Sequence, residues 1–377
     1  MAGIEEDYEV IVIGAGIAGA SLAYFLTQRG IARVLVVERE SQPAYHATGR
    51  SAASLVEIDL NPTVQDLKIL GGAFLRNPPP GFSESSLLEQ RGVLVLLDDA
   101  RWQSLNEGFE DLRTRGMPLR MINAESANRL VDGQLELRHF VGAAFLPYDG
   151  FIDVHELLSA YMAHARRAGA AFRFEVDAVP EIAAGRCIGV RVGDRTIRAG
   201  VVVDAAGAWA GEVARYADAT PVEMVAKRRC MAVLEVPQHH DLRHWPMVWS
   251  DDSRVYFRDD AGRLMMCPMD ELAMPPCDAS WDEEAIAAGI ERMCELAPQL
   301  RPRAVLHRWA GLRTFAPDNV PVVGYDPRRQ NFFWLAGQGG CGIETSGAVG
   351  ALAADLLIDY KTLRFDAAKL APGRFGS

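Results

Sequence analysis

The sequence predicts a mixed α/β protein, α+β overall, and three observations support this class. A strand, a glycine turn, a helix and a second strand follow one another over residues 8–39. Similar strand-to-helix successions return at residues 201–209 and 332–346, and the stretches between them contain mostly isolated strands and hairpins. Together they predict a Rossmann-type nucleotide-binding domain interleaved with an antiparallel-sheet domain.

The opening unit is organised around its glycine turn. Residues 10–13 are all apolar, as in a strand buried on both faces of a parallel sheet. The turn at residues 14–19, with the sequence GAGIAG, follows directly and begins a helix that ends at Gly30. A second apolar strand at residues 34–37 ends on Glu38.

Each position in this unit has a physical role in a dinucleotide site. Gly14 allows a sharp turn, Gly16 lacks the Cβ that would block a pyrophosphate, and Gly19 allows close helix–strand packing. The free N–H groups at the helix start would face the phosphates. Glu38, about 20 residues past the last glycine, would accept hydrogen bonds from ribose hydroxyls. The combination favours a dinucleotide site over an ordinary glycine turn.

The segment that follows is a second candidate for the same site. Residues 46–53 are mostly small apart from Arg50, which together with backbone amides would suit a pyrophosphate; the alternative is a surface loop. Asn61 and Pro62 then predict the cap and first turn of a helix through Phe74.

Two excursions interrupt the nucleotide-binding pattern. The first predicts a strand at residues 92–97 and helices at 102–115 and 124–130. The second contains a hairpin at residues 255–267 and a helix that begins at a capping box, residues 280–283. We predict an antiparallel sheet that covers a pocket, with a nucleotide-binding domain from residues 1–80, 146–220 and 305–377 and a substrate-binding domain from residues 81–145 and 221–304.

Composition limits the function classes. The formal charge of -11 and the pI near 5.3 argue against nucleic-acid binding, which needs a basic surface. The six cysteines form no C-x-x-C pair, and His46, His307, His239 and His240 lack further ligands at metal-binding spacing, so no metal site or redox dithiol is expected. No signal peptide or membrane-spanning stretch is visible, and we expect a cytoplasmic protein with reduced thiols.

The chain resembles the FAD-dependent D-amino-acid oxidase superfamily, and within it the bacterial D-arginine dehydrogenase and related D-amino-acid dehydrogenases. The likeness runs from Tyr8 to about Tyr360 and is most specific at residues 14–19, 46–53, 227–229, 309–315 and 338–346. It implies FAD as the cofactor, with a second glycine loop opening the final helix near flavin N1. Sarcosine oxidases carry a cysteine for covalent flavin where this chain has Gly311 and Leu312, so we expect non-covalent FAD.

The resemblance also implies the site residues. Arg313 and Arg229 would bind the substrate carboxylate with Tyr256 as a third donor; alternatively, Arg229 pairs with a structural acid and Arg313 lies at the surface. The substrate pocket would include Val93, Met247, Trp249 and Glu344. The residues expected to contact FAD are Gly14, Ala15, Gly16, Ile17, Ala18, Gly19, Glu38, Arg39, Thr48, Gly49, Arg50, Ser51, Ala52, Ala178, Ala206, Gly207, Trp209, Gly311, Gly340, Gly342, Ile343, Glu344 and Thr345.

Several positions depart from the pattern of the D-arginine enzyme. Val93 stands where that pattern has the glutamate for the substrate guanidinium, so a basic side chain would lose its partner. Ser54, Asp59 and Trp249 replace a histidine, a lid tyrosine and a small aliphatic residue. We therefore predict a small, apolar or aromatic D-amino acid as substrate. Glu344, which replaces a glutamine, could pair with a substrate amine and reopen that question.

The implied reaction is oxidative deamination of this amino acid. With the carboxylate fixed, the Cα–H would leave as hydride to flavin N5, and the imine would hydrolyse to the 2-oxo acid and ammonia. The rival hypotheses are a glycine- or sarcosine-type amine oxidase, the flavin subunit of an opine or proline dehydrogenase-like complex, and an NAD-dependent dehydrogenase. The last leaves the second glycine loop unexplained. The electron acceptor, oxygen or quinone, and the choice between a homo-oligomer and a complex subunit stay open.

Overall fold

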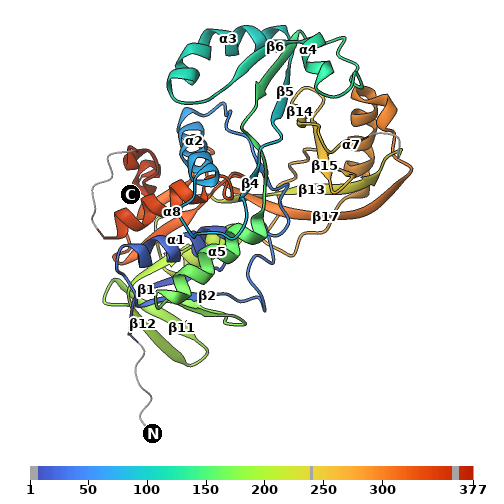
Figure 1. Ribbon diagram of the computed structural model, residues 1–377. Helices are drawn as coiled ribbons and strands as arrows, with labels where there is room; N and C mark the ends of the chain where they lie inside the picture. Colours follow the sequence, from blue (N-terminus) through green and yellow to red (C-terminus); the bar gives the residue numbers. More distant parts are fainter. Residues whose placement is uncertain (1–6, 238–240, 359–364, 377) are drawn as a thin grey trace.

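The computed structural model describes residues 7–237, 241–358 and 365–376, and these form two lobes (Figure 1). Each lobe is built on a sheet of eight strands. In Figure 1 the long strands β13 and β17 lie in the lobe opposite α1, α5 and α8. The predicted mixed α/β class, with a Rossmann-type sheet and a largely antiparallel one, is confirmed.

The first sheet contains the predicted nucleotide-binding core. The strands β9 (Ala171–Arg173), β2 (Val34–Val37), β1 (Asp7–Ile13), β12 (Arg195–Asp204) and β19 (Phe332–Ala336) lie side by side and parallel. An antiparallel hairpin extends it beyond β12, and one further antiparallel strand pairs with β19: β10 (Val179–Ala183), β11 (Arg186–Val192) and β18 (Val322–Tyr325). The centre of the sheet is therefore drawn from both ends of the chain.

Both faces of the first sheet are covered. Val10 and Val12 point into one apolar cluster, whereas Ile11 and Ile13 point into the cluster on the opposite face. Because neither face meets water, the strands are continuous apolar runs. The helices of this lobe are α1 (Ile17–Gln28), α5 (Val154–Arg167), α6 (Ala210–Tyr216) and α8 (Ser346–Leu357), preceded or followed by short 3₁₀ turns at Gly207–Trp209, Ala367–Lys369 and Pro372–Phe375.

The second sheet forms the wall of the other lobe. Its order is β17 (Ala304–Phe315), β13 (Val225–Glu235), β16 (Arg263–Cys267), β15 (Val255–Asp260), β14 (Met247–Ser250), β5 (Val93–Leu97), β7 (Gly142–Leu146) and β6 (Arg120–Asn123). Every neighbouring pair is antiparallel except β14 and β5, which are parallel. Because β5 and β14 come from different excursions, no local pattern in the sequence could specify that pairing.

Helices and a small sheet complete the arrangement. The second lobe carries α3 (Asp99–Thr114), α4 (Ala124–Arg129), α7 (Glu283–Leu296) and a 3₁₀ turn at Pro298–Leu300. A third sheet joins β3 (Ser54–Leu55), β8 (Gly150–Ile152) and β4 (Leu88–Glu89), and α2 (Pro62–Arg76) lies between the lobes (Figure 1). The predicted domain division stays a prediction. Strand β17, which apart from Ala304 falls in the segment 305–377, pairs into the second sheet.

Helix caps follow the local sequence with one exception. Asn61 accepts hydrogen bonds from the amides of Thr63 and Val64 at the start of α2, as predicted. The predicted capping box at residues 280–283 is wrong, because Asp282 is the N-cap of α7 and accepts from the amide of Ala285. A carboxylate reaches the third amide of the helix as well as a serine does.

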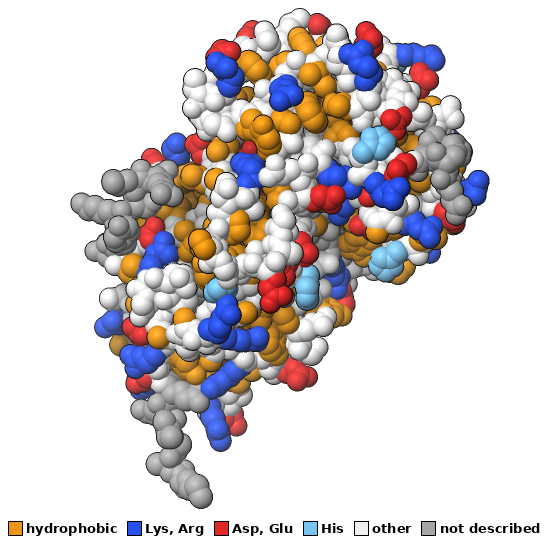
Figure 2. Space-filling model, in the orientation of Figure 1, with side chains coloured by type: hydrophobic (Ala, Val, Ile, Leu, Met, Phe, Trp, Pro, Cys, Tyr) orange, Lys and Arg blue, Asp and Glu red, His pale blue; other side chains and the backbone are white. Residues whose placement is uncertain are grey.

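The surface carries both signs of charge. On the face shown in Figure 2, acidic and basic side chains are interspersed around apolar ones. Among the residues that the structure describes, the helices are all too short or too polar to cross a bilayer.

Candidate active site

A cavity of about 340 Å³ is lined from both sheets. At one end lie the glycine turn of β1 and α1 and the end of β2, and at the other lie residues of β13, β14, β15 and β17. The predicted cofactor residues and the predicted carboxylate-binding residues therefore meet in one space, although they come from opposite parts of the chain.

The three glycines of the turn differ in what requires them. Gly14 has φ +110°, and a Cβ there would collide with the carbonyl oxygen of Ala205. A Cβ on Gly19 would collide with the carbonyl oxygen of Gly14, so both glycines are needed by the fold. Gly16 has an ordinary φ of -75°, and its nearest neighbour would be Thr48 Oγ1 at 3.3 Å. Because Gly16 lines the cavity, its missing side chain mainly leaves room for a ligand.

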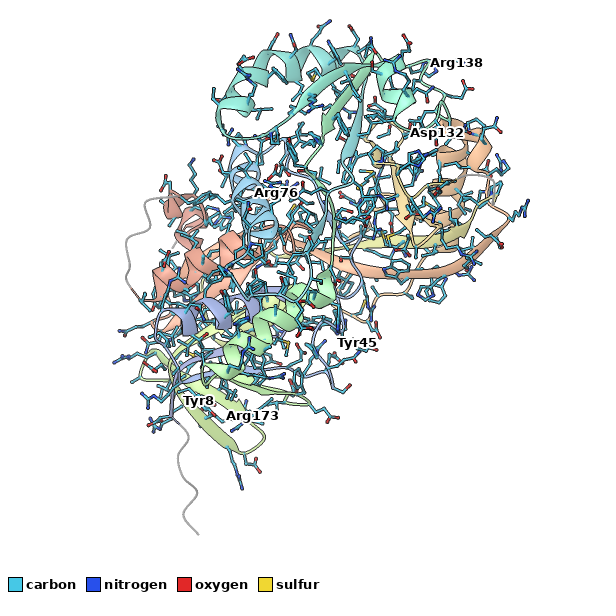
Figure 3. All side chains as sticks on the ribbon, in the orientation of Figure 1. Tyr8, Tyr45, Arg76, Asp132, Arg138 and Arg173 are labelled. Carbon is cyan, nitrogen blue, oxygen red and sulfur yellow. The ribbon has the colours of Figure 1, made fainter. Side chains whose placement is uncertain are left out.

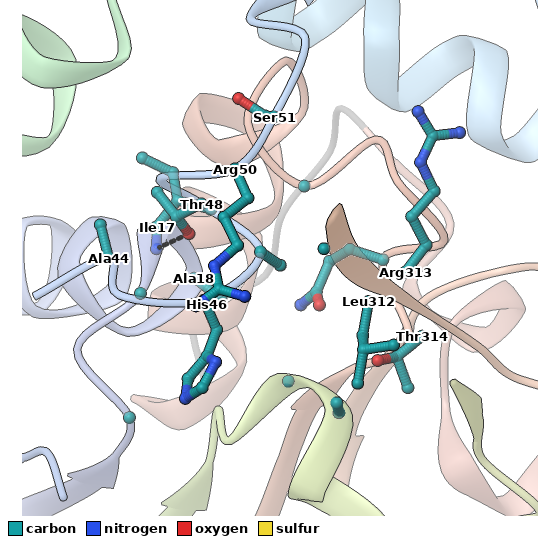
Figure 4. A pocket seen from close by; sticks show the side chains of 18 of the residues that line it. Ile17, Ala18, Ala44, His46, Thr48, Arg50, Ser51, Leu312, Arg313 and Thr314 are labelled. Atoms are coloured by element: carbon teal, nitrogen blue, oxygen red, sulfur yellow. Dashed lines mark hydrogen bonds between the residues drawn. The ribbon is translucent and has the colours of Figure 1, made fainter. Parts of the chain in front are cut away.

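The polar groups at this end suit a dinucleotide. The N-cap residue Gly16 has no side chain to bind the first amides of α1, and the amide of Ile17 donates to Thr48 Oγ1 at 3.1 Å (Figure 4). Glu38 is fixed at the end of β2 because its two oxygens accept from the amides of Ala15, at 2.8 Å, and Glu40, at 3.1 Å. A helix N-terminus and a fixed carboxylate are the groups that hold a pyrophosphate and a ribose.

A second glycine loop lines the same cavity from the other side. Gly340 has φ +91°, and a Cβ there would lie 2.7 Å from Arg313 Cδ, so the loop can pack against the arginine only without a side chain. The loop leads to Thr345, the N-cap of α8, whose side chain gives no capping hydrogen bond. A second helix N-terminus on the far side of the cavity suits the polar edge of a flavin.

Most of the expected cofactor residues line the cavity. These are Gly14, Gly16, Ile17, Ala18, Glu38, Arg39, Thr48, Arg50, Ser51, Ala52, Ala178, Ala206, Gly207, Trp209, Gly311, Gly340, Gly342, Ile343 and Glu344. Four others in the described chain lie behind the wall instead: Ala15, Gly19, Gly49 and Thr345. Thr345, for example, is buried and donates its hydroxyl to the carbonyl oxygen of Cys341.

Arg39 and Arg50 have protein partners at the cavity rim. The Arg39 guanidinium carbon lies 3.8 Å from the centroid of the Trp209 ring. Arg50 donates to the carbonyl oxygens of Tyr45, Ala279 and Ala310, and it pairs with Asp278 at 2.6 Å. Arg50 was expected to face a pyrophosphate, but in the structure these contacts direct its guanidinium toward the second lobe, and its role toward FAD stays a prediction.

The two arginines predicted to bind the carboxylate lie on paired strands, and Tyr256 lies on β15. In β13 and β17, Arg229 pairs with Gly311 and Lys227 pairs with Arg313, so the two arginines are diagonal neighbours on one face. Arg313 donates to the Tyr256 hydroxyl at 3.5 Å and, among the described carboxylates, forms no ion pair. Figure 4 shows its side chain extending away from Arg50, toward the pale blue helix α2.

Arg229 is already paired. Its side chain is only 6% exposed, and its Nη2 lies 2.5 Å from Glu271 Oε1. Its Nε is buried without a hydrogen-bond partner in the described structure. Arg229 thus pairs with an acid of the protein, as the alternative hypothesis expected. Among the described residues Arg313 has no such acid beside it and is available to an anion.

An apolar wall completes the substrate end. Trp249 and Tyr256 stack with ring centroids 4.7 Å apart and an interplanar angle of 14°. Met231 and Met247 line the cavity beside them. Burial raises the pKa of Tyr256, so its hydroxyl stays a neutral donor. Val93, expected in the pocket, is fully buried beside Met247, its partner on the neighbouring strand, and does not line the cavity.

Lys68 of α2 also lines the cavity and is not among the residues predicted from the sequence. Its Nζ lies 2.9 Å from Asp59 Oδ2 and 3.4 Å from Glu344 Oε1. A signal was present in the sequence, because Lys68 lies four residues after Val64 on the apolar stripe of the helix. A lysine in that position is buried only when it has a partner.

No cluster of metal-ligating side chains is found among the described residues. His46 instead contacts Glu40 at 2.8 Å and the Trp209 ring, and His307 stacks on Trp309. His239 and His240 lie outside the described residues.

The cavity lies between a nucleotide-binding sheet with two glycine loops and a second sheet that carries arginines. This arrangement is typical of a dinucleotide-dependent enzyme. The family model for the DAO family, described as FAD dependent oxidoreductase, matches residues 9–356. The chain therefore belongs to the DAO family of FAD-dependent oxidoreductases, and FAD is its cofactor. The glycine turns, the fixed Glu38 and the space at Gly16 fit that cofactor.

The comparisons also find relatives of known name. The chain is 24% identical to mitochondrial dimethylglycine dehydrogenase of Mus musculus over 98% of this chain and 44% of that protein. It therefore spans less than half the length of that relative. Glycine oxidase of Bacillus subtilis is 24% identical over 94% of each chain. The solved L-proline dehydrogenase of P. horikoshii is similar with a TM-score of 0.88, 23% identity and coverage of 99% and 98%.

These comparisons confirm the superfamily and leave its finer assignment uncorroborated. The relatives are named for glycine, dimethylglycine and proline rather than for D-arginine or another D-amino acid. Of the hypotheses drawn from the sequence, the glycine- or sarcosine-type amine oxidase agrees better with them than the D-amino-acid dehydrogenase does.

Proposed function

We propose that the protein oxidises the C–N bond of a small amino acid, with glycine, N-methylated glycines and proline as the preferred substrate class. The observation that carries the proposal is Arg313, a guanidinium inside the cavity that none of the described acids neutralises. Arg313 is only partly exposed, and a partly desolvated cation without a partner is costly, so the site is suited to receive an anion. The substrate carboxylate is that anion.

Two groups orient the carboxylate. A guanidinium can bind both carboxylate oxygens in one plane, which fixes direction as well as charge. The Tyr256 hydroxyl, which accepts from Arg313 at 3.5 Å, lies where it can donate to the same carboxylate. The carboxylate therefore determines which part of the substrate faces the cofactor end of the cavity.

Bound FAD supplies the two-electron acceptor for the oxidation. The protein contributes positioning and exclusion of water, through Trp249, Met231 and Met247 on the apolar side of the cavity. Such a wall leaves the amine and the Cα of a small substrate in a largely dry space. We also propose that FAD is held without a covalent bond, because Gly311 and Leu312 precede Arg313.

The size of the wall residues favours small substrates. Trp249 lies against Tyr256 and fills space that a long side chain on Cα would need. A substituent on the amine points away from the carboxylate, so an N-methyl group does not compete for that space. The proline ring adds carbon to Cα as well, but it folds back to the nitrogen and is shorter than a long free side chain. The names of the relatives support the same substrate class.

A substrate panel tests this proposal. The anaerobic loss of flavin absorbance is measured with sarcosine, N,N-dimethylglycine, glycine, L-proline, D-alanine and D-phenylalanine. We expect the first four to react at least about 10-fold faster than D-phenylalanine, since pocket fit to one or two carbon atoms is worth about 10- to 200-fold. Fastest reaction with the D-amino acids would restore the D-amino-acid dehydrogenase hypothesis. If none reduces the flavin, the proposal fails.

We further propose that the electrons leave to oxygen or a quinone. Oxygen consumption during turnover, compared with reduction of a soluble quinone, separates the two acceptors. Sedimentation of the purified chain, alone and in cell extract, tests whether it works as a homo-oligomer or as a subunit of a complex.

A further inference from the structure

A second charged group lies on the cavity wall formed by α2 and the loop before α8. The side chains of Lys68 and Glu344 are each only 8% exposed, and both line the cavity. Glu344 Oε1 lies 3.4 Å from Lys68 Nζ, and Glu344 Oε2 accepts from the Val56 amide at 2.8 Å. Lys68 also pairs with Asp59 at 2.9 Å. The Glu344 carboxylate is therefore fixed from two sides.

Helix α2 packs closely against the backbone of Glu344. A Cβ on Gly71 would collide with the Glu344 carbonyl oxygen, and one on Gly72 would collide with the Glu57 carboxylate. Lys68, Gly71, Gly72 and Arg76 follow one another on one face of the helix. The glycines allow the backbone of α2 to approach, and the approach places the Lys68 ammonium beside Glu344.

The charges on the two sides of the cavity are opposite. Lys68, Asp59 and Glu344 sum to one negative charge, whereas Arg313 contributes an unneutralised positive one. Lys68, Glu344 and Arg313 line the same cavity, so both sides act on the same space. A zwitterionic amino acid matches this arrangement, with its carboxylate at Arg313 and its ammonium at Glu344.

We propose that Glu344 binds the substrate ammonium and accepts its proton, with Lys68 and the Val56 amide as positioning groups. The inference rests on the proposed oxidation of an amino-acid amine. In this step an N–H bond breaks, an O–H bond forms on Glu344, and the electron pair stays on nitrogen. The step needs no oxidant, and it produces the neutral amine whose lone pair C–N oxidation requires.

The surroundings of Glu344 suit a proton acceptor. Burial raises its pKa, and Lys68 and the Val56 amide oppose that rise. A raised carboxyl pKa lies closer to neutral pH, where general bases are most effective. The other titratable groups that face it are Asp59 and Lys68, the thiol of Cys341 on its own loop, and Asp149, whose pKa the Glu344 charge helps to raise.

Asp149 and Glu57 form a neighbouring pair that shares one cation. Arg76, at the end of α2 (Figure 3), pairs with Glu57 and lies 3.7 Å from Asp149. Burial raises the pKa of both carboxyls. Because this pair belongs to the protein interior and does not line the cavity, it acts on Glu344 only through its charge.

The test compares Glu344→Gln with the wild-type holoenzyme. Glutamine keeps the size of the side chain and can still accept from the Val56 amide, but it has neither the charge nor the basicity. We expect the rate constant for flavin reduction at pH 7 to fall about 10²- to 10⁴-fold, and the rising limb of its pH profile to move to higher pH. Acetate, which has a carboxylate and no amine, should perturb the flavin spectrum with an unchanged Kd.

A second variant separates a positioning role from a structural one. Lys68→Met leaves Glu344 and Asp59 without their cation, so the pH limb should move upward by a smaller amount while Glu344 remains able to accept a proton. Loss of flavin or a lower Tm without movement of the limb would indicate a structural role and overturn the inference. Glu107→Gln, an exposed change on α3, is the matched control.

Two failures are distinguishable. If no amino acid reduces the wild-type flavin, the proposed function fails and this inference fails with it. If the wild type reacts and Glu344→Gln reacts equally fast with the same pH profile, only the proton-accepting role of Glu344 is overturned. A weakening of acetate binding equal to the loss of rate would also overturn it, because the residue would then shape the site in general.

Discussion

The two ends of the cavity are built from different parts of the chain. At the FAD end, backbone amides and glycines from residues 14–19 and 337–342 provide the shape, and each group of residues is continuous in sequence. At the substrate end, single side chains from α2, β13, β15 and β17 meet only after the second sheet has formed. Because backbone shape forms one end and side chains form the other, we expect mutations at the first end to change FAD affinity and mutations at the second to change substrate turnover.

The largest effect is expected from Gly16→Ala at the FAD end. The new methyl group meets only Thr48 Oγ1 at 3.3 Å within the protein, but it enters the space expected for the pyrophosphate. Losing one or two hydrogen bonds to a charged phosphate would weaken FAD binding about 10²- to 10⁴-fold. The measurement is the Kd of FAD for the apoprotein, with the apoprotein Tm alongside.

Gly108→Ala is the matched control for this change. Gly108 lies within α3, and a Cβ there has open space around it, so FAD affinity should not change. Normal FAD affinity in Gly16→Ala would mean that the space at Gly16 is not the phosphate site.

The next largest effect is expected from Arg313→Met at the substrate end. Removing the guanidinium leaves the substrate carboxylate unpaired, which would lower kcat/KM about 10²- to 10³-fold while flavin content stays normal. Steady-state kinetics and the absorbance ratio of flavin to protein measure the two quantities. Unchanged turnover would contradict the role of Arg313, and Arg301→Met, on the exposed pair with Glu291, is the control.

A smaller effect in the opposite direction is expected from Glu271→Gln. Arg229 is the residue that would serve as the second arginine of a carboxylate clamp, but its Nη2 lies 2.5 Å from a carboxylate oxygen of Glu271. The Glu271 side chain is 41% exposed. Without this competing carboxylate, Arg229 can turn to the substrate, and KM should fall about 2- to 5-fold. A rise in KM would show instead that Glu271 maintains the site. Glu291→Gln, which breaks a distant surface pair, should leave KM unchanged.

The last expected effect is on stability rather than on activity and concerns the FAD end. Asp204 lies at the end of β12. Its Oδ1 accepts a hydrogen bond from the Ala206 amide at 3.1 Å, and its Oδ2 is buried without a hydrogen-bond partner in the described structure. Burial raises its pKa to about 8. Because the folded form holds the proton more tightly, its contribution to stability is full below the unfolded pKa near 4 and is lost as the pH rises through about 8.

Asp204→Asn should remove this pH dependence. Between pH 5 and 7 the wild type should lose about 1 kcal/mol more of unfolding free energy per pH unit than the variant does. Denaturant unfolding at several pH values measures the difference. Parallel curves for the two proteins would show that Asp204 is ionised in the folded state.

Much of the FAD end could be predicted from sequence because its information is local. The turn at residues 14–19, Glu38 and the second glycine loop each depend on backbone geometry within a few residues. The strand and helix boundaries around them follow from apolar runs and caps, as at Asn61. Arg50 is the exception, because its partners Ala279 and Ala310 lie more than 200 residues away in sequence.

The substrate end could be predicted only in part. The family resemblance implies Arg313 and Tyr256, but Lys68 lies in a helix for which the sequence predicts only caps and length. Its partners Asp59 and Glu344 meet it only through the packing of α2 against the loop before α8. Likewise, the pairing of Arg229 with Glu271 depends on the path of the loop after β16, which no periodicity specifies.

The composition of the central sheet constrains when the cofactor can be acquired. β1 lies beside β12, which pairs in turn with β19, and the loop after β19 closes the flavin end of the cavity. A nascent chain from which residues 332–344 have not yet left the ribosome therefore lacks one wall of the cradle. Flavin insertion should therefore follow the synthesis of β19 and the loop after it, and chains truncated before β19 should be colourless.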